Sequence, residues 1–327
     1  MQKTAVLHGL TQRLGTLVSS HRGTKNMAFR LKSGKRLARE LSRVVAKEFE
    51  TATDELGGRQ DVDRAEAVHE ARKCVKKTRA VLHLLKRNLG QDYGVLDGRL
   101  RSIAHQLSTL RDVDASPAMM NALRDHYPRI VTRSMSRAVQ RGLLARTRGT
   151  VARVDPDRLL PRVASEIKRS GTRVQRRIRR VTQASAIRAG MRRGYRRARK
   201  AMACVRTRPE DASFHTWRRR VKDHWYHMRL LEGLAAYAQV RIRQLKQLET
   251  WLGDDHSLVV LRATILEAPA RFGNERMTAV ILGCVAKYQT TLRRRALKRG
   301  RQLFASRPSA FRTQIDRWWQ QGRARST

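Results

Sequence analysis

The stretch AVHEARKCVKKTRAVLHLLKRNLG, residues 67–90, combines a regular core pattern with dense positive charge. Mostly apolar side chains recur at alternating steps of three and four, the spacing of one helix face: Val68, Ala71, Val75, Thr78, Leu82, Leu85 and Leu89. At about 100° per residue, a second set falls on the opposite side: His69, Arg72, Lys73, Lys76, His83 and Arg87. The stretch therefore predicts a helix with one face in a core and one cationic face.

The whole chain shares this positive charge. Its 327 residues include 72 Lys and Arg against 27 Asp and Glu, a formal net charge of +45, with 40% hydrophobic residues. That content is enough for one large or two medium cores. A compact fold tolerates such self-repulsion better once an anionic partner neutralises it, and guanidinium groups match phosphate and carboxylate oxygens. The composition indicates a polyanionic partner.

The cysteines and the ends of the chain bear on the compartment. Cys74, Cys204 and Cys284 lie far apart and form no C-x-x-C pair, which argues against a disulfide framework or a thiolate zinc site. No run reaches the ~18 apolar residues of a membrane span, and the N-terminus lacks a secretory apolar region. Residues 1–39 precede the first acid and superficially resemble a basic organellar presequence, but the whole chain is equally basic. We expect a reducing, cytoplasmic location.

The pattern predicts an all-α protein. Only 7 prolines occur, and no clear period-two run rich in β-branched residues is present. The expected helices cover residues 33–56, 64–89, 95–110, 113–147, 157–206, 211–237, 239–252 and 256–300, with a short helix and a frayed tail after them. Breaks are expected at GGRQD, NLGQDYG, VDPD, TRPED and APARFGN.

The charged stretch occurs twice. FHTWRRRVKDHWYHMRLL from Phe214 aligns with VHEARKCVKKTRAVLHLL from Val68 at a constant offset, which places His215 under His69 and Lys222 under Lys76. Arg218, Arg219 and Val221 repeat Arg72, Lys73 and Val75. Two homologous helical modules explain this repeat, and the predicted division is residues 1–26 as a basic extension, 27–150 and 151–305 as two four-helix bundles, and 306–327 as a short helix and tail.

These residues resemble the conserved-histidine α-helical domain, the CHAD family, from about Met27 to about Gly300. The resemblance is most specific at VHEARKCVKKTRAVLHLL with LRDVD and at FHTWRRRVKDHWYHMRLL with WLGDD. It implies two four-helix bundles related by pseudo-twofold symmetry around a basic central channel that binds inorganic polyphosphate, and therefore a possible association with polyphosphate granules. The implied contacts, hereafter the basic stripe, are His69, Arg72, Lys73, Lys76, His215, Arg218, Arg219 and Lys222.

The chain departs from the family pattern at one acid. The aspartate expected after the second Leu-Gly, which corresponds to Asp112 in the first module, is replaced by Ser257. Asp254 and Asp255 are candidates to substitute for it. The Glu-x-Glu-x-Lys motif of the triphosphate-tunnel domain that is fused to some family members does not occur here.

Further residues extend the predicted site. His83, Arg87 and the repeat partner of His83, Arg229, continue the cationic faces, and Tyr226 lies close in angle to Lys222 on the second helix. The Tyr226 hydroxyl could donate to a ligand, or the ring could pack under Arg229. Three arginines at helical spacing before the second repeat could form another wall of a channel: Arg192, Arg196 and Arg199.

Three other interpretations compete with polyphosphate binding. His224 and His227 have the i, i+3 spacing of metal ligands but lack a third ligand, and His224 falls on the core side. Catalysis has little support, because the acids on the two charged helices, Glu70 and Asp223, form no metal-binding constellation. Sequence-nonspecific nucleic-acid binding remains the alternative function, since the net charge favours it, although no base-reading motif is present.

Overall fold

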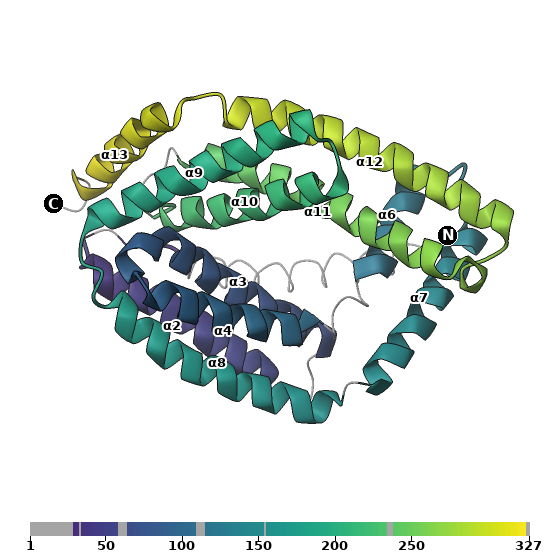
Figure 1. Ribbon diagram of the computed structural model, residues 1–327, viewed down its shortest axis with the longest axis horizontal. Coiled ribbons are helices and arrows are strands. Elements are labelled where there is room, and N and C mark those ends of the chain that lie inside the picture. Colours follow the sequence, from purple (N-terminus) through teal and green to yellow (C-terminus); the bar gives the residue numbers. More distant parts are fainter. Residues whose placement is uncertain are drawn as a thin grey trace, which may run out of the picture.

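The computed structural model describes residues 29–32, 34–57, 64–108, 115–153, 155–233 and 238–324. These residues form α-helices and one 3₁₀-helix (η1), with no strand among them, which confirms the predicted all-α class (Figure 1). None of the described helices is long and apolar enough to cross a membrane. The helices are α2 (Leu37–Leu56), α3 (Arg64–Leu89), α4 (Asp92–Gln106), α6 (Ala115–His126), α7 (Arg133–Arg153), α8 (Pro156–Ile178), α9 (Ala184–Thr207), α10 (Asp211–Leu230), α11 (Ala238–Glu267), η1 (Pro269–Arg271), α12 (Glu275–Leu303) and α13 (Pro308–Ala324).

The quoted stretch forms α3, with the bounds and the buried face that its periodicity predicts. Val68, Leu82 and Leu85 are almost fully buried, as are the other members of the predicted core stripe. Lys77, on the flank of this face, is also buried and forms an ion pair of 2.9 Å with Glu48 on α2. A buried charge needs such a partner, because desolvation would otherwise be very costly. This pair fixes α3 against α2.

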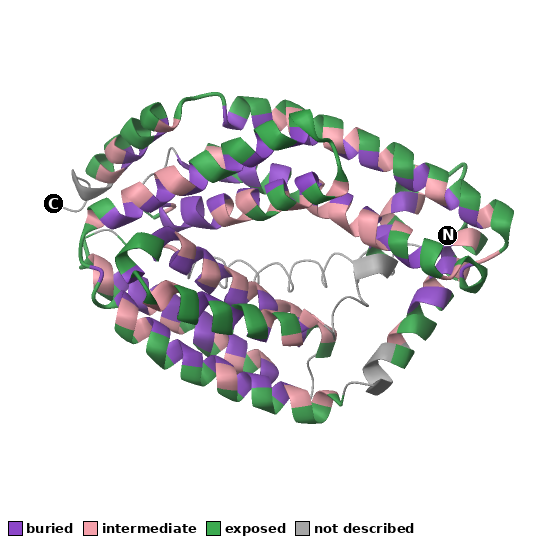
Figure 2. Cartoon of the chain, viewed as in Figure 1, coloured by how far each residue is buried: buried purple, intermediate pink, exposed green. Residues whose placement is uncertain are grey.

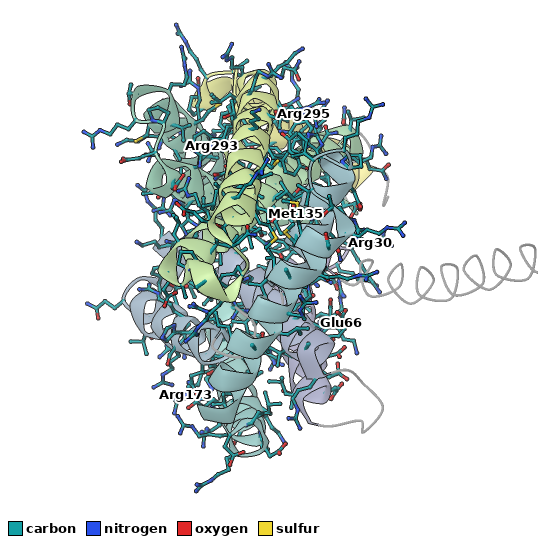
Figure 3. All side chains as sticks on the ribbon, turned by 90° about the vertical axis from the view of Figure 1, so that its right-hand side faces the viewer. Arg30, Glu66, Met135, Arg173, Arg293 and Arg295 are labelled. Atoms are coloured by element: carbon teal, nitrogen blue, oxygen red, sulfur yellow. The ribbon has the colours of Figure 1, made fainter. Side chains whose placement is uncertain are left out.

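Most helices pack around one large core. α2 packs against α3 and α8, and α4 packs against α3 and α8; farther along the chain, α10 packs between α9 and α11, with α13 against α9. α3 also contacts α9 and α10, so the two charged helices meet in the interior of the molecule. Outer helices such as α12 alternate buried and exposed positions (Figure 2). Long basic side chains project from the surface in many directions, including Arg173 and Arg295 (Figure 3).

A second, smaller core lies at the other end of the molecule. There α6 and α7 pack against one another, and α6 packs against α11 and α12 (Figure 1). Met120, Leu123 and Val139 are buried among Leu261 and Ile281. Segments that are far apart in the sequence therefore share this core.

Several predicted helix boundaries are wrong. The helix expected over 113–147 is divided into α6 and α7 around Pro128, which cannot donate a helical hydrogen bond. The helix expected over 157–206 ends at Ile178 and restarts at Ala184, through a basic turn that contains the poor helix formers Val181 and Thr182. The gap expected between 252 and 256 is absent, because α11 buries Leu252, Asp255 and Leu258 along one continuous face.

Other sequence predictions lie outside the described residues. These are the N-terminal extension over residues 1–26, the LRDVD motif with Asp112, and the C-terminal end of the helix expected over 211–237, of which residues 234–237 are not described. α10 itself ends at Leu230. A turn follows, in which the Leu231 amide donates to the Met228 carbonyl.

Candidate functional site

The first half of the basic stripe lies on α3, on the side away from its core face. Arg72 is buried, whereas His69, Lys73 and Lys76 are half-buried. The Lys73 ammonium pairs with the Glu70 carboxylate at 2.8 Å, one helical turn earlier. Burial would raise the pKa of Glu70, but the Lys73 pair outweighs it and lowers that pKa. Glu70 thus holds a charge on the stripe rather than acting as a proton donor.

The second half of the basic stripe lies on α10. His215, Arg218 and Lys222 are half-buried and Arg219 is exposed. The Lys222 ammonium pairs with the Glu249 carboxylate on α11 at 2.8 Å, and Lys246 pairs with the same carboxylate at 2.8 Å. Burial would raise the pKa of Glu249, but the two lysines lower it to about 2. This triad fastens the stripe of α10 to α11.

Gly253 on α11 lies directly against Arg218. A Cβ atom at that position would lie 3.7 Å from Arg218 Nε, in ordinary contact. The guanidinium group therefore runs along the surface of α11, where it is placed beside both α10 and α11. The end of the WLGDD motif, which falls in the gap expected between residues 252 and 256, is instead part of the helical surface beside this arginine.

His256 joins the site from α11 and was missed by the sequence analysis. Its Nδ1 lies 3.3 Å from Nδ1 of His215, and the two ring centroids are 4.4 Å apart. Burial lowers the pKa of His256 to about 4, helped by the positive charge of Arg218, by His215 and by Lys76. Burial, Arg218 and Arg219 likewise lower the pKa of His215.

The packing of α3 against α10 links the two halves of the basic stripe. Lys76 lies on α3, in the first repeat, yet its ammonium group is close enough to affect His256 on α11. The fold therefore brings a basic residue of the first repeat to the His215, Arg218 and His256 group of the second. Their shared positive potential favours an anion and disfavours protonation of both imidazoles.

Asp255 takes on an ion-pairing role near the place where the family aspartate is missing. Its carboxylate pairs with Arg293 of α12 at 2.7 Å, and Arg293 also pairs with Asp211 at the start of α10. Asp211 pairs in turn with Arg262 at 2.5 Å. Asp255 is therefore a structural residue of α10, α11 and α12. Asp254 is half-buried; burial, with Glu249, raises its pKa, partly offset by Lys246 and Arg218.

His83 occupies a different environment from the basic stripe. Its Nδ1 lies 3.0 Å from Asp223 on α10, and its Nε2 lies 3.3 Å from Asp97 on α4. Burial would lower the pKa of His83, but the hydrogen bonds to the two carboxylates raise it. Arg79 and Arg101 also pair with Asp97. His83 is thus part of an ion network that connects three helices.

The arginines of α9 form a second basic group. Arg193 donates to the Leu84 carbonyl at 2.9 Å, and its pKa is lowered by burial and then by four nearby guanidinium groups, those of Arg87, Arg197, Arg192 and Arg196. Arg196 and Arg199 are exposed. The Arg199 Nε atom donates to the Phe304 carbonyl at 3.1 Å, toward the connection between α12 and α13.

Tyr226 and Arg229 lie in the interior rather than on an open face. Tyr226 is 3% exposed and packs edge-on against Phe29. Arg229 is 4% exposed, with its guanidinium 5.2 Å from the Trp225 ring centroid and 5.6 Å from that of Phe29. This burial supports the packing alternative for Tyr226.

His224 and His227 are also interior residues. His227 Nε2 donates to the Ala80 carbonyl of α3 at 2.9 Å, and His224 is surrounded by the rings of Tyr195, Phe304 and Phe311. Burial lowers the pKa of His227 to about 4. Within the described ranges, no group of three His, Cys, Asp or Glu side chains is arranged to hold a metal ion.

The fold and this site define a class: an all-helical domain in which two repeated His-x-x-Arg helices pack in the interior. The model of the CHAD domain matches residues 43–266, most of the chain, and the chain belongs to that family. Its structure is similar to the "Crystal structure of the CHAD domain from the plant Ricinus communis", with 18% sequence identity, a TM-score of 0.58, and coverage of 85% of this chain and 94% of that one. A comparison with curated proteins finds no match.

Proposed function

We propose that this protein binds inorganic polyphosphate through the basic stripe and His256, without transforming it. The observation that carries the proposal is the packing of α3 against α10, which brings the two repeats together; in keeping with it, Lys76 of α3 helps to lower the pKa of His256 on α11. One isolated cationic helix face is usually solvated surface. Two repeated faces that converge on one place favour a shared ligand.

The chemistry of the cluster suits a flexible chain of phosphates. Polyphosphate carries about one negative charge per phosphate and has no bases to read, so it is recognised by rows of donors that match its charge density. Arginine supplies two parallel N–H donors and lysine a point charge. Because His83 is engaged by two carboxylates, the part of α3 proposed to contact the ligand runs from His69 to Lys76, roughly 10 Å at ~1.5 Å per residue.

Binding, rather than catalysis, is proposed because two acids beside the stripe are committed to ion pairs. Glu70 pairs with Lys73, and Glu249 pairs with Lys222 and Lys246. We further propose that the two modules are pseudo-twofold related four-helix bundles whose basic residues line a central channel. Such a protein could be carried to polyphosphate granules in the cytoplasm.

The decisive experiment is a competition at about 0.15 M salt and then at higher salt, with labelled long-chain polyphosphate challenged by duplex DNA at equal phosphate concentration. Retention of polyphosphate as salt rises, with no displacement by DNA, supports the proposal. Equal competition along one salt slope would mean that the net charge acts as an unshaped patch and that nucleic acid binds equally well.

Matched variants localise the binding. Lys76→Ala/His215→Ala/Arg218→Ala is expected to weaken polyphosphate binding by about 100-fold or more, because several charge-assisted hydrogen bonds are removed. Arg294→Ala/Arg295→Ala/Lys298→Ala is the control, since it removes three exposed basic residues from α12. The control should lose less than about threefold. Equal losses in both variants would contradict a localised site.

A further inference from the structure

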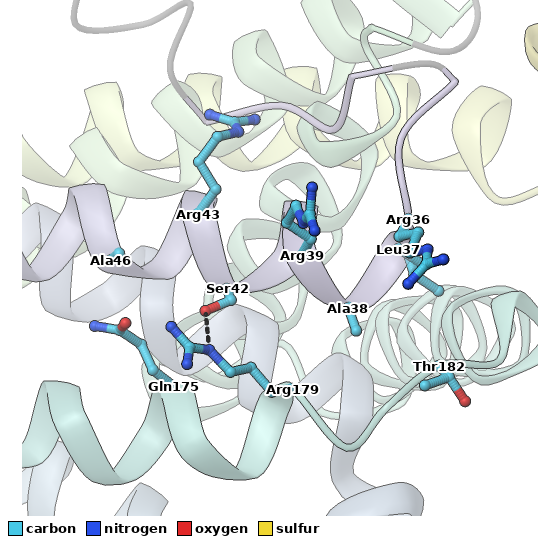
Figure 4. Close-up of a pocket in the computed structure, with 10 residues that line it drawn as sticks. All are labelled: Arg36, Leu37, Ala38, Arg39, Ser42, Arg43, Ala46, Gln175, Arg179 and Thr182. Carbon is cyan, nitrogen blue, oxygen red and sulfur yellow. Dashed lines mark hydrogen bonds between the residues drawn. The ribbon is translucent and has the colours of Figure 1, made fainter.

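A groove between α2 and α8 is separate from the basic stripe. It has a volume of about 700 Å³. The residues that line it are Arg36, Leu37, Ala38, Arg39, Ser42, Arg43, Ala46, Gln175, Arg179 and Thr182 (Figure 4). No member of the basic stripe lines it. Polyphosphate binding at the basic stripe therefore does not explain what this groove binds.

Four of the residues that line this groove are arginines and none is an acid: Arg36, Arg39, Arg43 and Arg179. Two of the four are fixed by neighbours. Arg43 pairs with Glu40 at 2.7 Å and donates to the Arg30 carbonyl at 2.8 Å, and Arg179 Nε lies 3.4 Å from the Ser42 hydroxyl (Figure 4). The contact with Ser42 joins Arg179 of the turn after α8 to α2 across the groove.

The other two arginines are available for a ligand. Arg36 and Arg39 are exposed, and neither forms an ion pair with another described residue. Two further exposed arginines, Arg176 and Arg180, lie on α8 and in the turn after it and add to the local positive field. Glu40 pairs with Arg43 from outside the groove lining, and no acid lines the groove itself. An anion is the ligand that such a surface favours.

The volume of the groove and its uncharged lining residues indicate which class of anion fits it. A volume of 700 Å³ falls in the range of small-molecule sites, about 300–1,000 Å³, and is larger than one phosphate needs. Leu37, Ala38 and Ala46 give it an aliphatic part, and Gln175 and Thr182 add neutral donors and acceptors. Arginine forks suit phosphate oxygens and also stack on planar rings.

We propose that this groove is a second anion site, which binds the oligophosphate group of a small molecule. Two sources share this chemistry: inorganic tripolyphosphate, and a nucleoside triphosphate whose base rests on the aliphatic part. The proposal does not depend on polyphosphate binding at the basic stripe, because the two sites share no residue.

The test uses the full chain with Lys76→Ala/His215→Ala/Arg218→Ala as the background, so that the basic stripe is disabled. A fluorescent ATP analogue is titrated at about 0.15 M salt and then displaced by unlabelled ATP or by tripolyphosphate. Addition of Arg39→Ala/Arg179→Ala is expected to weaken binding by about 10-fold or more, whereas Arg294→Ala/Arg295→Ala on α12 should weaken it by less than about threefold.

Each outcome decides the proposal. Tighter displacement by ATP assigns the site to a nucleotide, and tighter displacement by tripolyphosphate assigns it to the inorganic anion. Loss of all binding in the background variant, or equal weakening by the groove and α12 pairs, overturns the groove as a site. Circular dichroism of each variant distinguishes lost binding from lost folding, and Arg43 is left intact because of its contacts with Glu40 and Arg30.

Discussion

Two adjacent imidazoles in a positive field give the proposed site a pH dependence. His215 and His256 both have pKa values lowered by burial and by neighbouring basic groups, His256 to about 4. Both are therefore neutral near pH 7 before a ligand binds. A bound polyanion would reverse the local potential and favour the charged forms, so that binding takes up protons.

We therefore expect polyphosphate affinity to rise as pH falls from about 7.5 to about 5.5, by up to about 10-fold per pH unit for each proton taken up. The sign follows because the pKa values in the free protein are lower than those in the complex. Isothermal titration at several pH values, in buffers of different ionisation enthalpy, measures both affinity and proton uptake. His215→Gln/His256→Gln should flatten the profile, and an unchanged slope in this variant would contradict the assignment.

His83 gives the opposite kind of pH effect, on stability rather than on binding. Its folded-state pKa is raised by Asp223 and Asp97 despite burial, so its contribution is complete below the unfolded pKa and is lost as pH rises through the folded pKa. His83→Gln should reduce the free energy of unfolding by about 1 kcal/mol more at about pH 5.5 than at about pH 8.5. Denaturant unfolding at the two pH values checks this, and an equal loss at both would exclude the titration.

Close helix approach between α3 and α9 depends on a glycine. A Cβ atom on Gly190 would overlap the backbone carbonyl of Leu84, which cannot move without displacing α3. Gly283 on α12 is the matched control, because nothing lies within 4 Å of its Cβ position.

Gly190→Ala should therefore destabilise the protein by about 2–4 kcal/mol through overpacking of this interface. Gly283→Ala should stabilise it by about 0.5–1 kcal/mol, since alanine loses less backbone entropy in a helix. Both values come from denaturant unfolding of the two variants. A neutral Gly190→Ala would show that α3 and α9 do not approach so closely in solution.

The same central packing explains what the sequence could and could not predict. α3 was predicted to the residue because its core stripe is regular and the expected breaks at GGRQD and NLGQDYG flank it. Helical angles placed Tyr226 near Lys222, but α10 packs against α9, α11 and α3, and its last residues, 226–230, are all buried. For the same reason Arg229 stacks on Phe29 and Trp225. A two-faced pattern predicts orientation only for a helix that has solvent or ligand on one side.

His256 could not be assigned from helix α3 or α10, because it lies on neither. The repeat register offered one signal: the loose alignment of the second helix pairs sets His256 against Arg111, a basic residue in the corresponding place. The contact between His256 and His215, however, depends on how α11 packs across α10. The spacing of residues within one helix does not predict how two helices cross. The Asp97–His83–Asp223 network was hidden for the same reason, since its members come from three helices.

At the scale of the whole molecule, the charge of +45 acts on folding as well as on partners. Like charges distributed over the surface destabilise the compact state, and salt screens them, with a Debye length near 10 Å at 0.1 M. We expect the melting temperature to rise by several degrees between about 20 mM and about 500 mM sodium chloride.

Differential scanning calorimetry measures this shift, with polyphosphate added in a parallel series. Polyphosphate should raise the melting temperature further at low salt, because it binds the folded protein. A melting temperature that falls with salt would mean that the ion pairs, such as Arg293 with Asp255, contribute more than the repulsion costs.

The second core has a consequence for how the chain is made. Its first contributors, α6 and α7, end at Arg153, 85 residues before α11 begins at Ala238, so Met120, Leu123 and Val139 have no completed core to join when they leave the ribosome. At typical elongation rates this interval lasts on the order of ten seconds. During translation the nascent hairpin is therefore a natural client for a holding chaperone, and pauses placed between codons 153 and 238 would lengthen its exposure.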